Sequence, residues 1–269
     1  AIHLKTQGVF NKPMLVLPAD HYVADSDNFR KIISLASVLA EKEEVIVTIG
    51  VVPNRPETGY GYLRRGEAKR IIKGVEVYEV KQFVEKPDYT TALAYLTSGK
   101  YFWNSGIFIF TPEVILKDIS RYLPSVYAGL EKIAQYIGTK NYPEVLASVY
   151  QELPSISIDY GVMEKTDRCI FTIPGNFGWS DVGSWESVYD LRKEERDNAE
   201  NLVQGKAIAI ETQSSFIFNP TTKLVVSLGT KNLLIVNTED ALLVANLKRS
   251  QDIRKVIEKL KAEELSSLL

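Results

Sequence analysis

The sequence predicts an α/β domain with a doubly wound, mostly parallel sheet, followed by a small C-terminal β-rich lobe. The first observation is a strand–helix–strand pattern. Residues 14–17 form a short apolar run, residues 27–40 carry a helical apolar stripe, and residues 44–51 are rich in β-branched side chains. This pattern is typical of the βαβ unit of a parallel sheet. The second observation is a series of short β segments after residue 201 with no helix between them, which indicates a separate β-rich lobe.

The composition is that of an ordinary globular protein, with 269 residues of which 45% are hydrophobic and 25% charged. A net charge of −2 gives no global basic field for a nucleic-acid partner, although a small anionic substrate needs only a local positive cluster. The single cysteine, Cys169, excludes an internal disulfide, and we expect it to be a buried core residue. Because no membrane-spanning run and no signal peptide are visible, we expect a cytoplasmic protein without a membrane partner.

The domain boundary is predicted in a charged stretch, residues 191–200, which is typical of a helix end and a linker. The α/β domain then covers residues 1–198 and the β-rich lobe residues 199–269. A final amphipathic helix, residues 250–260, could pack on the lobe or on a second subunit, since one face carries Ile253, Val256, Ile257 and Leu260.

A stretch flanked by aromatic residues, residues 176–185, has one carboxylate at its centre, Asp181. Gly178 and Gly183 allow the chain to turn there and to approach another group closely. An unpaired carboxylate between bulky rings would be costly to bury, and a metal ion or a donor-rich ligand would remove that cost. A tight turn with two core tryptophans and a solvated Asp181 explains the pattern equally well.

Asp20 follows the apolar run of residues 14–17 after only two residues. A short continuous apolar run predicts a strand buried on both faces, and open α/β sheets bind ligands at the carboxyl ends of their strands. If Asp20 and Asp181 both lie at the same edge of the sheet, they could share a divalent cation. Mg²⁺ is a candidate because it prefers carboxylate oxygens and substrate phosphates.

Six motifs follow one another along the chain: LPADH, PETGYGY, FVEKPD, YFWNSGIF, SIDYGVMEK and NFGWSDVGSW. Together they closely resemble the mannose-1-phosphate guanylyltransferases, which are sugar-nucleotide pyrophosphorylases. The resemblance implies a Rossmann-like nucleotide-diphospho-sugar transferase fold with an abbreviated β-helix-like tail. It also implies transfer of a guanylyl group from GTP to α-D-mannose 1-phosphate, which gives GDP-mannose and pyrophosphate with Mg²⁺ as cofactor. The β-rich tail and the last helix are compatible with a homodimer.

The resemblance also assigns roles to individual residues. Asp20 and Asp181 resemble the catalytic carboxylates that hold Mg²⁺. The substrate-binding positions that it implies are Tyr60, Gly61, Glu85, Lys86, Asn104 and Asp159.

The residues alone allow plainer interpretations of these positions. Glu85 and Lys86 are a common surface pair, and the glycines around Tyr60 are compatible with a simple turn. Ser157 or Asp159 could cap the following helix. The aromatic residues next to Asn104 could serve core packing alone.

The chain departs from the family at its start, because no glycine-rich, phosphate-gripping loop precedes Asp20. We therefore expect either a truncated chain or one that has lost this element. Two alternative functions follow: a catalytically silent sugar-phosphate-binding or regulatory chain of the same fold, and a glycosyltransferase that uses a nucleotide sugar. The latter usually shows Asp-x-Asp, but residues 25–27 are more typical of a helix cap. Pyrophosphate release would separate the guanylyltransferase from both.

Overall fold

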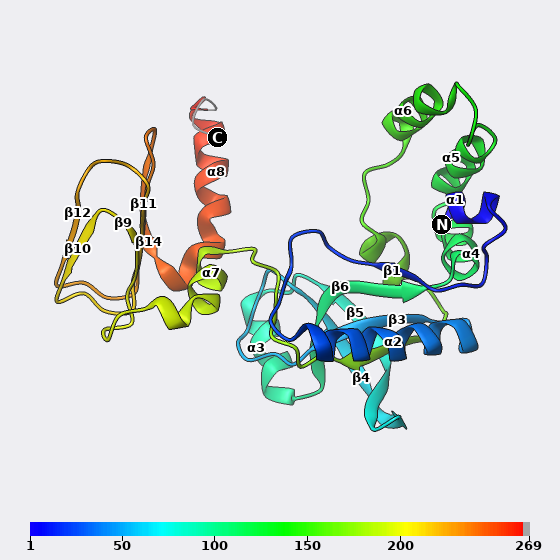
Figure 1. The fold of residues 1–269 in the computed structure, drawn as a ribbon, viewed down its shortest axis with the longest axis horizontal. Coiled ribbons are helices and arrows are strands. Elements are labelled where there is room, and N and C mark those ends of the chain that lie inside the picture. The colour runs from blue at the N-terminus through cyan, green and yellow to red at the C-terminus, as the bar shows by residue number, and fades with distance from the viewer. Residues whose placement is uncertain (266–269) are drawn as a thin grey trace. The chain divides into compact units, whose positions relative to one another are not determined.

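A computed structural model describes residues 1–265, and for Ala68 and Lys69 it describes the backbone alone. The chain forms two compact units (Figure 1). Unit 1 comprises Ala1–Ala19 and Val23–Trp179, and unit 2 comprises Asp20–Tyr22 together with the chain from Ser180 onward. The predicted boundary at residues 198 and 199 stays a prediction. No helix among the described residues is long and apolar enough to cross a membrane.

Unit 1 is built on a six-stranded sheet with the strand order β1-β6-β3-β7-β5-β4. The strand β6 pairs with β4 as well. The centre of the sheet is fully buried, because Ile46, Val47 and Ile49 of β3 have no exposed surface. The strands are β1 (Met14–Val16), β3 (Ile46–Val51), β4 (Gly61–Ile72), β5 (Val75–Glu85), β6 (Tyr101–Phe110) and β7 (Ile170–Pro174).

The expectation of a mostly parallel sheet is wrong. Among the described pairs of this sheet, only β3 and β7 are parallel; the others are antiparallel. One reason is the hairpin of β4 and β5, whose turn residues Lys73 and Gly74 both have positive φ, 49° and 80°. A two-residue turn of this kind can join only antiparallel strands. The strand β6 also runs against both of its neighbours β1 and β3.

The strand before Asp20 is not buried on both faces as expected. The strand β1 lies at the edge of the sheet, where β6 is its one partner among the described strands. Leu15 and Val16 are 40% and 38% exposed. A short apolar run cannot by itself distinguish an edge strand from a central one, because both have the same composition.

Helices cover both faces of the sheet, as the doubly wound prediction requires (Figure 1). On one face, α2 (Ser26–Glu43) packs Ile32, Leu35 and Leu39 against the central strands, and Asp25 caps its start. On the other face lie α4 (Pro112–Tyr122) and a π-helix (Asp159–Met163). The remaining helices of unit 1 are α1 (Ile2–Thr6), α3 (Tyr89–Ser98), α5 (Pro124–Ala134) and α6 (Tyr142–Glu152).

Unit 2 contains the predicted β-rich lobe. The parallel pairs β9–β11, β11–β13 and β10–β12 show that the chain winds through two stacked sheets, as in a short β-helix. Inside it, the Asn237 amide donates to Asn219 Oδ1 at 2.8 Å, so stacked polar side chains satisfy one another. Its strands are β9 (Leu202–Gly205), β10 (Ala207–Ile210), β11 (Phe216–Asn219), β12 (Val225–Leu228), β13 (Leu233–Asn237) and β14 (Leu242–Asn246).

Helices pack on one side of this lobe. The helix α7 (Trp185–Leu191) shares a core with the lobe through Tyr189, Phe216 and Leu234. A 3₁₀ helix (Lys193–Glu195) follows α7, and another (Leu247–Asp252) leads into α8 (Ile253–Ala262), the predicted amphipathic helix, none of whose residues is buried. The chain crosses between the two units at the short strands β2 (Tyr22–Val23) and β8 (Trp179–Ser180), which pair with each other.

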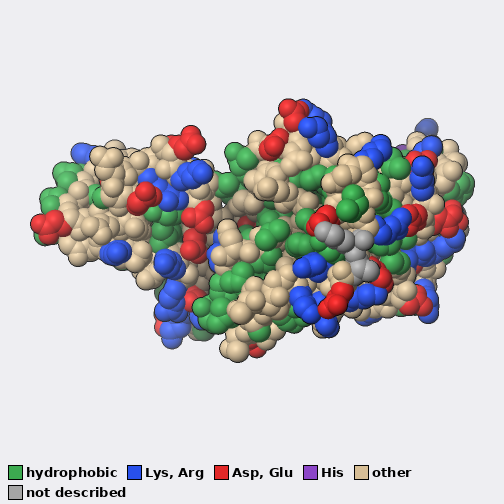
Figure 2. Space-filling view, turned by 90° about the horizontal axis from the view of Figure 1, so that it is seen from below, with side chains coloured by type: hydrophobic (Ala, Val, Ile, Leu, Met, Phe, Trp, Pro, Cys, Tyr) green, Lys and Arg blue, Asp and Glu red, His purple; other side chains and the backbone are tan. Residues whose placement is uncertain are grey.

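The surface has no large field of one sign on the face that Figure 2 shows. Basic and acidic side chains lie interspersed there, with apolar side chains between them. This distribution agrees with the small net charge of −2.

Candidate functional site

Three of the predicted substrate-binding side chains meet in unit 1. Glu85 is the last residue of β5, Asn104 lies on β6, and Asp159 begins the π-helix. The Asn104 amide nitrogen donates to Asp159 Oδ1 at 3.3 Å. Lys86 forms an ion pair with Glu85, and the side chains are 44% and 11% exposed, respectively. We call Glu85, Lys86, Asn104 and Asp159 the sugar-side cluster, because they are the residues predicted to bind the sugar.

Gly61 lies directly beside this cluster because it is the register partner of Glu85 on the neighbouring strand. A Cβ built on Gly61 would lie 2.4 Å from Glu85 Oε2 and 3.3 Å from the Cβ of Asn104. Only glycine therefore allows the Glu85 carboxylate to lie over the strand at this point. The carbonyl of Tyr60 accepts a hydrogen bond from the backbone N–H of Lys86 at 3.2 Å, which fixes the ends of β4 and β5 together.

A buried hydroxyl holds Asn104 in one orientation. Its amide oxygen accepts from the backbone N–H of Gly106 at 3.2 Å and lies 3.3 Å from Thr48 Oγ1, whose one proton is shared between this oxygen and the Ile107 carbonyl at 3.0 Å. Since the oxygen faces two donors, the amide nitrogen must face Asp159. Sequence reasoning missed Thr48, because a threonine within a β-rich segment looks like any other strand residue.

The electrostatics of the cluster favour a proton on Asp159. Partial burial raises the pKa of Asp159, and the nearby Glu85 carboxylate raises it further. Hydrogen bonding and the positive charge of Lys86 oppose this shift. Two carboxyl groups in one cluster can thus accept hydrogen bonds from hydroxyl groups or, when protonated, donate one.

Aromatic rings form a wall next to Gly61. Tyr60 packs edge-to-face on Trp103 and on Trp179, with ring centroids 5.1 Å and 5.4 Å apart. The Arg55 guanidinium lies 5.3 Å from the centroid of the Trp103 ring. Glu57, which is buried, accepts from Arg55 Nε at 3.1 Å. The predicted turn is therefore a structured loop, and its Arg55 and Glu57 were missed because isolated charges in a proline-containing loop are usually solvated.

The carboxylates predicted to bind a metal both belong to unit 2. Asp20 and Asp181 are far apart in sequence, but the charges of both affect the same imidazole, that of His21. Partial burial lowers the pKa of His21, and the charges of Asp181 and then Asp20 oppose that shift. Asp181 Oδ1 accepts from the backbone N–H of Gly183 at 3.0 Å.

Asp20 and Asp181 would supply only part of the coordination that a metal ion needs. No group of three or more His, Cys, Asp or Glu side chains within the described residues could hold an ion by itself. Two carboxylates supply the hard oxygen donors that Mg²⁺ prefers, and they leave positions for phosphate oxygens and water. The donor set therefore suits a cation that completes its coordination with water or with the phosphate oxygens of a substrate.

Asp159 does not serve as a helix cap, which was its plainer interpretation. The cap residue before the π-helix is Ile158, and it makes no side-chain cap hydrogen bond. It is instead Ser157 Oγ that accepts from the backbone N–H of Tyr160, at 3.4 Å.

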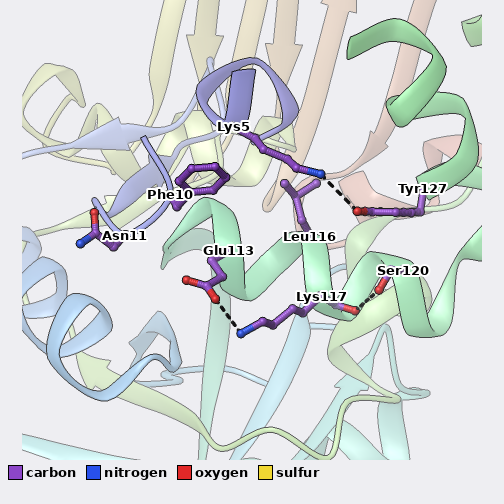
Figure 3. A pocket seen from close by; sticks show the side chains of 8 residues that line it. All are labelled: Lys5, Phe10, Asn11, Glu113, Leu116, Lys117, Ser120 and Tyr127. Atoms are coloured by element: carbon purple, nitrogen blue, oxygen red, sulfur yellow. Dashed lines mark hydrogen bonds and ion pairs between the residues drawn. The ribbon is translucent and has the colours of Figure 1, made fainter. Parts of the chain in front are cut away.

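One cavity of unit 1 contains none of the predicted site residues. It has a volume of about 580 Å³ and lies between α1, α4 and α5 (Figure 3). Lys5 donates to Glu131 at 2.6 Å and to the Tyr127 hydroxyl at 3.4 Å, and Lys117 pairs with Glu113. Because both ammonium groups already have carboxylate partners, this cavity offers no unpaired charge to a phosphate.

Comparison with known proteins matches both parts of the chain. A family model described as nucleotidyl transferase matches residues 1–198. A second, described as a mannose-phosphate isomerase/GMP-like β-helix domain, matches residues 205–260.

Curated relatives agree with these matches. A mannose-1-phosphate guanylyltransferase of Escherichia coli K12 is 40% identical over 93% of this chain and 52% of its own length. Another, from Salmonella typhimurium, is 38% identical over 93% of this chain and 51% of its own length. The chain thus spans about half the length of the curated relatives it matches.

A solved structure extends the agreement to the fold. A crystal structure from Thermus thermophilus, described as a mannose-1-phosphate geranyltransferase, has a TM-score of 0.79 and 35% sequence identity. The match covers 97% of this chain and 72% of that chain.

Proposed function

This chain belongs to the nucleotidyl transferase family, among the relatives of the mannose-1-phosphate guanylyltransferases, and we propose that it transfers a guanylyl group from GTP to α-D-mannose 1-phosphate. The products are GDP-mannose and pyrophosphate. A phosphate oxygen of the sugar phosphate attacks the α-phosphorus in line, the bond to the β-phosphate oxygen breaks, and pyrophosphate leaves.

The observation that carries this proposal is the sugar-side cluster beside Gly61. Its carboxylates and the Asn104 amide offer acceptors and donors within one small region, as vicinal hydroxyl groups require. Thr48 holds the Asn104 amide and Gly61 leaves space for Glu85, so the polar groups are ordered without a ligand. Such preorganisation is what a sugar-binding site needs, because the sugar then pays little to order the protein.

The proposed phosphate-side groups are Asp20 and Asp181, which would hold Mg²⁺. Bound there, the ion would supply neutralisation of the charge on two phosphorylated reactants. The carboxylates themselves would fix the position of that ion, and the Lys86 ammonium adds a positive charge beside Glu85. GTP, mannose 1-phosphate and GDP-mannose are the proposed ligands, while the homodimer and the cytoplasmic location stay predictions.

The test is pyrophosphate release from GTP and mannose 1-phosphate with Mg²⁺, measured on this chain and on Asp181→Asn. We expect release that requires both substrates and falls sharply in the variant. Saturable binding of GDP-mannose without pyrophosphate release would contradict the proposal and support a silent sugar-binding chain. Release of GDP from GDP-mannose in the presence of a sugar acceptor would instead indicate a glycosyltransferase.

A further inference from the structure

Gly183 makes room for the carboxylate of Asp181. A Cβ built on Gly183 would lie 2.2 Å from Asp181 Oδ2 and 3.0 Å from Asp181 Cγ. The three atoms nearest to that Cβ all belong to the Asp181 carboxyl group. The φ of Gly183 is outside the left-handed region, so its backbone alone does not require glycine. A glycine is therefore required at position 183 because the Asp181 carboxylate occupies the space that a side chain would need.

The residue between them, Val182, is held in a strained conformation. Its φ is 53°, in the left-handed region that a β-branched residue rarely adopts. Such strain persists only where the surrounding chain fixes the backbone. Here two hydrogen bonds fix the backbone: Ser180 Oγ accepts from the N–H of Val182 at 3.1 Å, and Asp181 Oδ1 accepts from the N–H of Gly183 at 3.0 Å.

The next turn of chain is fixed as well. Ser184 Oγ accepts from the N–H of Ser187 at 3.1 Å and thereby caps α7. The buried hydroxyl of Ser250, on the 3₁₀ helix before α8, accepts from the N–H of Glu186 at 3.2 Å. A cavity of about 350 Å³ lies against Val182 and Gly183, so these hydrogen bonds rather than side-chain packing hold the turn from that side.

We propose that Gly183 is a positioning residue that holds the Asp181 carboxylate in one rotamer for its cation. The inference rests on the proposed function, in which Asp181 binds Mg²⁺. The Gly183 N–H fixes Oδ1, and the missing side chain leaves the space that Oδ2 occupies. A carboxylate that is already ordered loses little conformational entropy when the ion binds. The strained backbone of Val182 accompanies this fixed position of the Asp181 carboxylate.

Gly183→Ala tests this with Mn²⁺ as the probe, its binding measured by electron paramagnetic resonance without nucleotide. The methyl group displaces the carboxylate, and we expect Mn²⁺ affinity to fall about tenfold, as when groups that orient metal ligands are changed. The melting temperature should change little, because the clash is with the end of a side chain that can rotate. Gly66→Ala is the control, since its Cβ would meet nothing closer than 3.4 Å.

A double-mutant comparison separates positioning from a general effect on the fold. In the Asp181→Asn background, which already lacks the ligand charge, Gly183→Ala should change Mn²⁺ affinity much less than in the wild type. A crystal structure of Gly183→Ala should show the Asp181 carboxylate turned away from its wild-type position.

The outcomes distinguish this inference from the proposed function. Wild-type Mn²⁺ binding that Asp181→Asn weakens but Gly183→Ala does not, or an unmoved carboxylate, overturns the role of Gly183. Mn²⁺ binding that both variants weaken, without pyrophosphate release, supports Gly183 and contradicts the proposed reaction. A wild type that releases pyrophosphate but binds no Mn²⁺ overturns the role of Gly183 and leaves the proposed reaction standing.

Discussion

The two groups of candidate residues are held in place by different means. In the sugar-side cluster, Glu85 and Asn104 lie on two strands of the large sheet of unit 1, and Asp159 lies on the π-helix that packs against that sheet. The hydroxyl of buried Thr48 lies next to the Asn104 amide oxygen. Asp181 of unit 2 sits instead on a short turn whose shape depends on hydrogen bonds between near neighbours in sequence. Side chains that are positioned by the register of a sheet should keep their places after a single substitution nearby. A side chain that is positioned by one turn should move when even one methyl group is added to that turn.

The largest effect is expected from the turn. Asp181→Asn keeps the shape of the side chain but removes the charge that would hold Mg²⁺. Pyrophosphate release at saturating mannose 1-phosphate should fall by about 10²- to 10³-fold, as when one stabiliser of transition-state charge is removed. A fall smaller than about threefold at every Mg²⁺ concentration would show that this carboxylate is not a ligand.

A somewhat smaller effect is expected from the sugar-side cluster. Glu85→Gln removes an ionised acceptor, and a hydrogen bond to a charged group is worth about 1.5–3 kcal/mol. The KM for mannose 1-phosphate should therefore rise about 10- to 100-fold. Gly61→Ala should have a similar effect, since its methyl group would displace Glu85. If both variants keep the wild-type KM, the cluster does not bind the sugar.

The buried support of Asn104 should have a measurable but smaller influence. Thr48→Val removes the hydroxyl that donates near Asn104 Oδ1 and the carbonyl of Ile107, at 3.3 Å and 3.0 Å. We expect a loss of about 1 kcal/mol of unfolding free energy and a several-fold rise in the KM for mannose 1-phosphate.

Thr172→Val is the matched control for this change. Thr172 is equally buried, and its hydroxyl has no hydrogen-bond partner among the described residues. Chemical denaturation should show this variant to be as stable as the wild type or more so. Equal losses in the two variants would mean that the Thr48 hydroxyl supports nothing specific.

The smallest effect concerns pH. The folded protein raises the pKa of Asp159, so it binds a proton there more tightly than the unfolded chain does. The contribution of Asp159 to stability is therefore favourable at low pH and is lost as pH rises from its unfolded pKa through its raised folded pKa. Asp159→Asn should consequently raise the melting temperature at pH 7 relative to the wild type and leave it nearly unchanged at pH 4. A variant less stable than the wild type at pH 7 would contradict the burial argument.

The elements of the fold were predictable where a long periodic pattern defined them. The helix α2 follows from its apolar spacing and from a capping residue, Asp25, at its start. Strand direction was not predictable, because the same apolar runs fit parallel and antiparallel neighbours. The hairpin turn at Lys73 and Gly74, which decides it, has only one glycine as a local signal.

The candidate site was predictable to the extent that its residues carry charge or lie within motifs. Asp20, Asp181, Glu85 and Asn104 were identified in this way, and their roles stay predictions. Thr48 was not identifiable, because its role depends on a register contact across the sheet that no local pattern shows. Gly183 was recognised as a turn residue, but only the folded turn reveals which atom requires it.

We expect a division of tasks, in which Asp20 and Asp181 hold the cation that binds phosphate and the sugar-side cluster binds the sugar. It is tested most directly by titrating Mg²⁺ and mannose 1-phosphate in parallel for Asp181→Asn and Glu85→Gln, with pyrophosphate release as the readout. We predict that Asp181→Asn shifts mainly the Mg²⁺ dependence and Glu85→Gln mainly the mannose 1-phosphate dependence. Equal shifts of both dependences in both variants would contradict it.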